Sequence, residues 1–300
     1  MSRALGLVGF ALAAAAVGAL AVRGGPGSDR PTLAPAVELV GRATQTVDRA
    51  AAQALGVDIE DERRLGDRMH PLLAARSVGG EDEAYVRAVL AEITPLARKP
   101  LVWQAYLIFD PSPNAMAFPG GAIAVTTGLL RTLDAEDELA GVLAHEVAHV
   151  ELSHGLDAAK YEIVSAKLGA EPLGEVAGWL ERTLWRTSFD QSAEAEADRW
   201  AFEALVVSSW DPTGLARGFQ HLAASAPAPR PGVNPMRDYL ASHPPIAGRV
   251  SRYQEAARAW WAANRGATRW RGAEAYAARA RPSVDRRSDP EPVAAYTPDG

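Results

Sequence analysis

The feature that most constrains this chain is a pair of histidines, His145 and His149, set four residues apart inside one long predicted helix. Apolar residues continue along this segment at helical spacing through Leu139, Val142, Leu143, Val147 and Val150. Any fold of the chain must therefore bury one face of a helix that also presents two imidazoles.

Both ends of this helix carry recognisable signals. Asp134 is expected to be the N-cap, with Asp137 in the capping-box position. Glu136 and Glu138 add negative charge near the positive end of the helix. Gly155 is expected to end the helix.

The two imidazoles can serve one metal ion. Residues four apart on a helix project from the same face, so His145 and His149 can reach one tetrahedral cation. Glu146 lies beside them and can take the proton of a water that attacks a carbonyl. With 6 histidines in 300 residues, chance would produce this pattern roughly 0.01 times per chain. Buried histidines satisfied by core partners are the alternative interpretation.

A third ligand must be His, Asp or Glu, because the chain contains no cysteine. His154 follows His149 by five residues, which would be well off the ligand face of a continuing helix. We interpret it as a cation at the helix C-terminus, as a group behind the ligands, or as a plain surface residue.

A downstream acidic helix offers better candidates. Glu194 and Asp198 are four residues apart and share a helix face, whereas Glu196 points elsewhere. One of the two carboxylates can bind the metal while the other accepts the free N–H of a ligating imidazole.

Two strands are predicted before the histidine helix. Residues 101–110 are rich in β-branched and aromatic side chains, residues 111–114 form a turn, and residues 121–128 form the second strand. We expect the two strands to pair antiparallel.

Helical patterns cover most of the remaining chain. The first runs over residues 36–96, with Pro71 and the Gly79–Gly80 pair as breaks. Further helices are predicted over residues 156–187, 192–207 and 245–280.

Composition excludes one class of partner. The formal net charge is −6 and no basic block is present, so a nucleic-acid partner is not expected.

Four motifs in one order resemble the CAAX prenyl protease, HtpX and BepA group of zinc metallopeptidases. They are His145–His149, Glu194 to Asp198, Asn114–Gly121 and Ser242–Pro245. The resemblance implies an α+β, mostly helical, zincin-like domain of the gluzincin type, with a small antiparallel sheet packed by the His-Glu-x-x-His helix.

The resemblance also implies a site. One Zn²⁺ per chain would be held by His145, His149 and Glu194. Glu146 would match the catalytic base of the family, and Asp198 would match the acid that supports a ligating imidazole.

Three further residue roles follow from the same resemblance. The strand of Gly121, Ala122, Ile123, Ala124 and Val125 resembles the edge strand on which such enzymes lay an extended substrate. His243 would stabilise the oxyanion or lie over the metal in a closed form, with a loop histidine that anchors a proline turn as the alternative. Arg249 would pair with an acid near the site.

The predicted organisation has four parts. Residues 1–22 are a signal peptide or a single membrane anchor, since residues 4–22 carry no charge, and residues 23–35 are a Gly/Pro linker. Residues 36–280 are the metallopeptidase domain, with its motif core at about 100–250, and residues 281–300 are a disordered tail.

The predicted function is hydrolysis of peptide bonds in an extended polypeptide. Its expected substrates are unfolded or misassembled proteins of the cell envelope, and its expected location is the periplasm or envelope, with membrane association through residues 4–22 if these stay uncut. Two alternatives remain: a protease-fold chaperone or scaffold that works by binding, and a non-proteolytic zinc hydrolase.

Overall fold

The computed structural model describes residues 56–156, 189–225 and 246–278, together with residues 159, 163, 164, 175–178 and 243. The predicted signal or anchor segment, the linker and the C-terminal tail lie outside the described residues. Within the described ranges, no helix combines the length and the apolar character that crossing a membrane requires.

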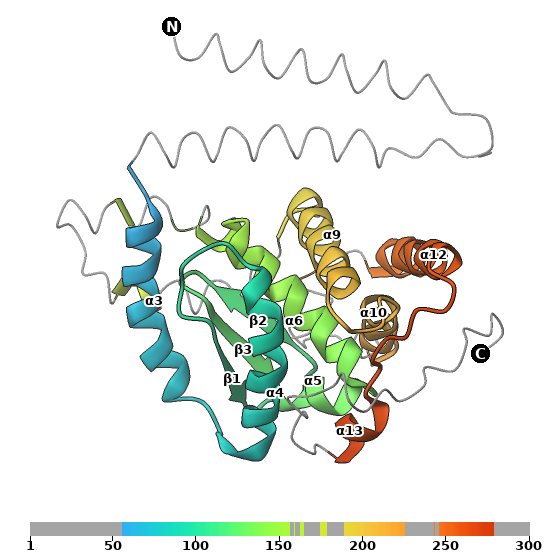
Figure 1. Ribbon diagram of the computed structural model, residues 1–300. Coiled ribbons are helices and arrows are strands. Elements are labelled where there is room, and N and C mark those ends of the chain that lie inside the picture. The colour runs from blue at the N-terminus through green and yellow to red at the C-terminus, as the bar shows by residue number, and fades with distance from the viewer. Residues whose placement is uncertain are drawn as a thin grey trace, which may run out of the picture.

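Helices make up most of the described chain and surround one small sheet (Figure 1). In chain order the elements are α3 (Ile59–Ala74), α4 (Gly80–Ile93), η1 (Thr94–Leu96), β1 (Gln104–Ile108), β2 (Ala115–Phe118), β3 (Ala122–Thr126), α5 (Thr127–Thr132), α6 (Glu136–Glu151), α9 (Gln191–Val207), α10 (Gly214–Ser225), α12 (Ile246–Ala263) and α13 (Ala273–Ala278). The predicted α+β, mostly helical class is confirmed.

The sheet is mixed, and its order is β1-β3-β2. Strand β1 runs parallel to β3, with Gln104 opposite Ala122, while β2 runs antiparallel to β3. The prediction that the two strands found from sequence pair antiparallel is therefore wrong. The segment between them supplies β2, and the β2–β3 hairpin places β3 in the middle of the sheet.

The hairpin turn depends on a close approach of two glycines. Gly120 has φ +93, and a Cβ there would lie 2.2 Å from the Cα of Gly66 on α3. The turn therefore packs directly on α3.

The two faces of the sheet pack into two apolar clusters, because successive strand residues point to opposite sides. On one face, Leu107, Ile123 and Val125 join the cluster that contains α4 and α6. On the other face, Met116 and Phe118 join the cluster that contains α3. Figure 1 shows α3 and α6 on opposite sides of the sheet.

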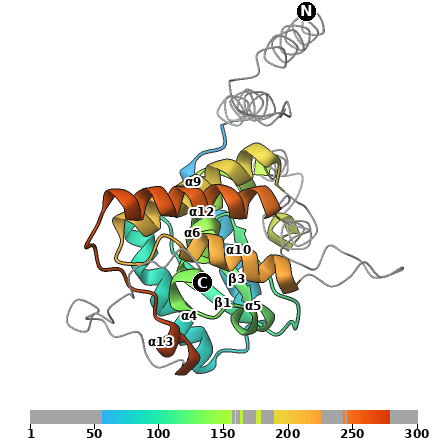
Figure 2. The same cartoon turned by 90° about the vertical axis from the view of Figure 1, so that its right-hand side faces the viewer.

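Helix α6 is the centre of the helical layer. It packs against α9 and α10, and α12 packs against α10 (Figure 2). The close approach of α10 requires Gly214, where a Cβ would lie 2.5 Å from the carbonyl oxygen of Asp137.

The ends of α6 differ from prediction. The N-cap is Ala135, without a side-chain cap, and the backbone N–H of Asp134 instead donates to the carboxylate of Glu138 at 2.9 Å. The helix ends at Glu151, and the left-handed residue after it is Ser153, with φ 67, rather than Gly155. The predicted N-cap at Asp134 and stop at Gly155 are wrong.

The predicted helix break at Pro71 is wrong, because α3 continues through this residue. A proline inside a helix costs about 3 kcal/mol. Burial of Leu65, Met69 and Leu73, all fully buried, contributes about 1.5–3 kcal/mol for each side chain and outweighs this cost.

Other helix boundaries agree in part. The predicted break at Gly79–Gly80 is confirmed, with φ angles of 64 and 84. The last predicted helical region is split into α12 and α13, and α10 was not predicted at all.

Candidate metal centre

Helix α6 brings His145 and His149 together in the interior. Both rings are buried, and their Nε2 atoms lie 3.0 Å apart. From α9, the carboxylate of Glu194 lies 3.5 Å from Nε2 of His145 and 3.4 Å from Nε2 of His149. Together with His243, these residues form a buried group whose candidate ligand atoms all lie within 4.8 Å of one another.

These groups lie close enough together to bind one metal ion. Ligand atoms at about 2.0–2.1 Å from a tetrahedral zinc are separated from one another by about 3.3 Å. The two Nε2 atoms are 3.0 Å apart, Oε2 of Glu194 lies 3.5 Å from that of His145, and Oε1 of Glu194 lies 3.4 Å from that of His149. Two imidazoles and one carboxylate also form a donor set that suits zinc.

A buried ion-pair network holds the first imidazole. Nδ1 of His145 lies 3.0 Å from Oδ1 of Asp198, which leaves Nε2 for the metal. Arg249 on α12 donates to both oxygens of Asp198, at 2.8 and 2.7 Å. Its Nη1 also lies 2.8 Å from Oε2 of Glu194, so one guanidinium fixes both carboxylates. The predicted pairing of Arg249 with an acid is confirmed.

The surroundings shift the pKa values of the titratable groups in this site in different directions. Although burial opposes it, the carboxylates of Asp198 and Glu194 raise the pKa of His145 to about 9. Burial lowers the pKa of His149 well below its ordinary value. Burial alone would raise the pKa of Glu194, but His243 and Arg249 hold it well below its ordinary value. Glu194 is therefore ionised and able to bind a cation.

Glu146 lies next to these groups, but its hydrogen bonding and the shift of its pKa differ from those of Glu194. Its carboxylate is fully buried, and neither oxygen has a hydrogen-bond partner of good geometry. Nε2 of His243 lies 3.5 Å away, and the backbone of Ala117 faces it. Burial raises the pKa of Glu146, as expected for a group that has to accept a proton.

His243, which is distant in the sequence, is the fourth member of this buried group. Its Nδ1 lies 2.8 Å from Oε1 of Glu194 and 3.3 Å from Nε2 of His145. Arg249 donates to the backbone carbonyl of His243 at 2.7 Å, which anchors this residue over the site.

Two residues lie behind His149. His154 is off the ligand face as expected, and its Nδ1 lies 2.9 Å from Nδ1 of His149, which agrees with the interpretation as a group behind the ligands. Phe189 stacks on the His149 ring, with centroids 4.1 Å apart and planes at 22°. No local pattern signals either contact, because one depends on a chain reversal at Ser153 and the other on the packing of a separate segment.

The predicted substrate strand is corrected by the sheet order. The strand of Gly121, Ala122, Ile123, Ala124 and Val125 contains β3, which is paired on both sides, so its backbone has no free edge for a third strand.

Among the described strands, the edge strand nearest to the site is β2, which is buried and packs against α6. Hydrogen-bonded and non-bonded pairs alternate between antiparallel strands. Because the amide of Thr126 donates to the carbonyl of Asn114, Ala115 and Ala117 direct their backbone groups away from β3.

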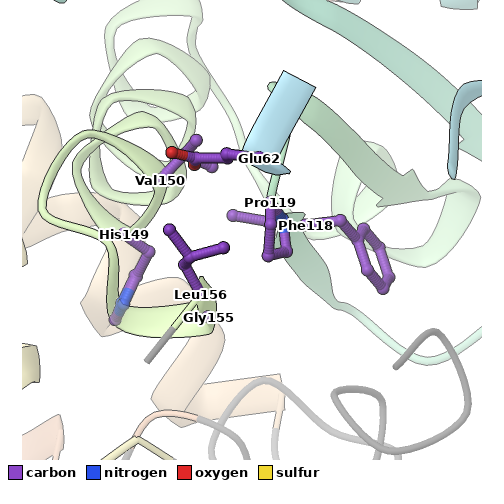
Figure 3. Close-up of a pocket in the computed structure, with 8 residues that line it drawn as sticks. Glu62, Phe118, Pro119, His149, Val150, Gly155 and Leu156 are labelled. Carbon is purple, nitrogen blue, oxygen red and sulfur yellow. The ribbon is translucent and has the colours of Figure 1, made fainter. Parts of the chain in front are cut away.

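A small pocket lies beside this edge (Figure 3). It is lined by Glu62, Ala117, Phe118, Pro119, His149, Val150, Gly155 and Leu156.

A His-Glu-x-x-His helix, a carboxylate from a second helix and a small sheet beside them define a domain of the metallopeptidase class. The model of peptidase family M48 matches residues 81–257, which is more than half of the chain. The chain belongs to this family.

Curated relatives agree with this assignment. The mitochondrial metalloendopeptidase OMA1 of Schizosaccharomyces pombe is 26% identical over 197 residues, which cover 63% of this chain and 56% of the relative. The beta-barrel assembly-enhancing protease of Yersinia pestis is 36% identical over 135 residues, covering 39% and 28%. Metalloprotease YcaL of Escherichia coli is 30% identical over 135 residues, covering 42% and 52%. The matches thus span between about a quarter and just over half of these relatives.

Proposed function

We propose that the chain is a zinc-dependent endopeptidase. The observation that carries this proposal is the convergence of the Nε2 atoms of His145 and His149 and the carboxylate of Glu194 in one buried group, with the buried carboxylate of Glu146 beside them. Membership of peptidase family M48 supports it.

Each residue then has a separate task. A bound zinc ion would supply a Lewis acid that polarises the scissile carbonyl and lowers the pKa of water. Glu146 takes the proton of the attacking water and returns it to the departing amine. Asp198 accepts the N–H of His145 and keeps its ring oriented. His243 lies where it can donate to the oxyanion once substrate has displaced it from Glu194.

The substrate binds as an extended polypeptide along the edge strand β2. The outward backbone groups of Ala115 and Ala117 provide the pairing, because an unpaired strand edge accepts another strand. Ala117 also faces Glu146, so a chain paired there would pass directly by the general base.

The proposed substrates are unfolded or misassembled proteins of the cell envelope. The name of the Yersinia pestis relative, a beta-barrel assembly-enhancing protease, supports this class. The uncharged segment of residues 4–22 supports export to the periplasm or envelope, either as a cleaved signal or as a retained anchor.

The decisive variant is Glu146→Gln in the full chain. It preserves the size of the side chain but removes the base, so casein cleavage should fall by at least about 100-fold while zinc content stays at one ion per chain. Retained cleavage in Glu146→Gln would refute Glu146 as the base. A wild-type chain that binds zinc but cuts no casein, with an unchanged phenotype in Glu146→Gln cells, would refute the endopeptidase and favour a protein that works by binding.

The substrate class needs a separate measurement. Envelope proteins that accumulate in cells carrying Glu146→Gln, and are cut by the purified wild-type protein when unfolded, would support it. Accumulation confined to cytosolic proteins would contradict both the substrate class and the location.

A further inference from the structure

His154 lies directly behind His149, on the side away from the other candidate ligands. The Nδ1 atoms of the two rings are 2.9 Å apart, and the ring planes meet at 72°. Both side chains are buried, with 1% of His149 and 6% of His154 exposed. Two buried ring nitrogens at this distance form a hydrogen bond only if one carries a hydrogen and the other a lone pair.

The proposed metal site decides which nitrogen carries the hydrogen. A neutral His149 that binds the metal through Nε2 has its hydrogen on Nδ1. His154 must then accept that hydrogen bond at its own Nδ1, and its hydrogen is on Nε2. The two tautomers are therefore coupled.

A carboxylate stands at the far end of this pair. Oε2 of Glu196 lies 3.6 Å from Nε2 of His154, and 19% of the Glu196 side chain is exposed. This separation is longer than a direct hydrogen bond, but a negative charge there favours the tautomer with the hydrogen on Nε2. Glu196 belongs to α9, the same helix that supplies Glu194.

The chain reversal after α6 is what brings His154 back to His149. Ser153 adopts a left-handed φ of 67, a conformation that costs a non-glycine residue about 1 kcal/mol or more. Lys99 offsets this cost, because its Nζ donates to the carbonyl of Val150 at 2.7 Å and to Oγ of Ser153 at 2.8 Å.

We propose that His154 and Glu196 are positioning residues that fix the tautomer and the ring orientation of His149 for the metal. This inference rests on the proposed function, since it requires a metal at Nε2 of His149. Asp198 serves His145 in the same manner, so each imidazole of the pair has its own support.

The test is the zinc affinity of the full chain, measured by competition with a chromophoric chelator. His154→Leu keeps an apolar side chain of similar size but removes the acceptor, and zinc affinity should fall at least about tenfold. In His154→Asn the amide oxygen stands where Nδ1 stood, since both atoms are bonded to Cγ, so most of the affinity should return.

Two matched controls separate positioning from folding. His221→Leu removes a histidine that contacts Glu138 instead of the site, and should leave zinc affinity unchanged. Glu196→Ala should weaken zinc binding by at least about threefold, whereas Glu203→Ala, at an exposed position of the same helix, should not.

The outcomes are distinguishable. Wild-type zinc affinity in His154→Leu, or equal losses of zinc affinity in the leucine and asparagine variants, overturns the proposal that His154 positions His149. If His154→Leu does not fold, unchanged zinc affinity in Glu196→Ala overturns it. A wild-type chain that binds no zinc refutes the proposed function itself.

Discussion

The two ends of α6 carry two clusters of buried polar side chains that differ in how their polar groups are arranged. At the N-terminal end, Glu136, Asp137 and Glu138 are fully buried, and each carboxylate has a partner. Tyr85 donates to Glu136 at 2.7 Å, and Arg217 pairs with the other two acids. From the sequence, Glu136 and Glu138 were expected only to add charge near the positive helix end, and Asp137 to complete a capping box.

Further donors complete the N-terminal cluster. The indole N–H of Trp270 donates to Glu136 at 3.0 Å, and Nδ1 of His221 lies 3.0 Å from Glu138. The backbone N–H of Asp137 donates to the carbonyl of Arg271. The acids therefore tie α4, α10 and the chain before α13 to the start of α6.

At the C-terminal end of the helix, the imidazoles have partners behind them, and their other ring nitrogens converge with Glu194 on one point. Glu146 has no hydrogen-bond donor of good geometry, and the Nε2 atoms of His145 and His149 face each other and Glu194. A buried polar group without a partner costs free energy, so such an arrangement is maintained for a ligand or a reaction. The N-terminal acids connect neighbouring segments, whereas the C-terminal groups are arranged around one point, with Glu146 beside it, which marks that end as the place of chemistry.

The largest expected effect breaks the N-terminal cluster. Arg217→Ala leaves Asp137 and Glu138 buried without their cation, which should lower the free energy of unfolding by about 3–5 kcal/mol. Urea unfolding measures this, with exposed Arg131→Ala as the control, expected to change stability by at most about 0.5 kcal/mol. Zinc affinity of the folded fraction should be unchanged, and a parallel loss of zinc would show that the two clusters are one unit.

The next effect breaks the C-terminal cluster. Glu194→Ala removes a proposed ligand and should weaken zinc binding by more than about 100-fold, beyond what residues that only orient a ligand contribute. Metal analysis of the purified chain checks this, and removal of zinc from the wild type by a chelator should abolish cleavage until zinc is restored. Unchanged zinc stoichiometry in Glu194→Ala would refute the ligand assignment.

A smaller effect on zinc affinity distinguishes a residue that binds the metal from one that only orients a ligand. Asp198→Asn keeps an oxygen acceptor for Nδ1 of His145 but removes the charge that Arg249 pairs with, so zinc affinity should fall about tenfold. Chelator competition measures it, with Glu203→Gln on the same helix as the control. A loss as large as that of Glu194→Ala would make Asp198 a ligand.

The smallest effect concerns pH. Burial raises the pKa of Asp137 well above 3.8, although Arg217 opposes it, so the folded state binds this proton more tightly than the unfolded state. The contribution of Asp137 to stability is therefore present at low pH and is lost as pH rises from 3.8 through the folded pKa. Asp137→Asn should become progressively more stable relative to wild type as pH rises above 3.8, by less than the Arg217→Ala effect. A difference in urea midpoint that stays constant with pH would contradict this.

Local patterns were sufficient for the parts of the site that lie within one helix. The pairing of His145 with His149 and of Glu194 with Asp198 follows from a spacing of four residues, which places side chains on the same helix face whatever surrounds them. The assignment of Glu194 to the same metal came from resemblance, since 45 residues separate it from His149 in the chain numbering.

Non-local contacts account for the errors. The pairing of β1 with β3 depends on where the β2 hairpin folds back, and this decides which strand has a free edge. The polar side chains at the start of α6 are hydrophilic in sequence but buried in space, because their partners come from segments as distant as Trp270. Periodicity carries no information about such partners.

The sequence by itself determined the chemistry that one helix can present: two imidazoles and a carboxylic acid at residues 145, 146 and 149, on a stripe that had to be buried. The tertiary structure decided what completes and surrounds them: Glu194 and His243 at the imidazoles, Arg249 across two acids, and His154 turned back by Ser153. The physical reason is range. Backbone hydrogen bonds fix a helix face within a few residues, whereas the packing of distant segments fixes which groups meet across it.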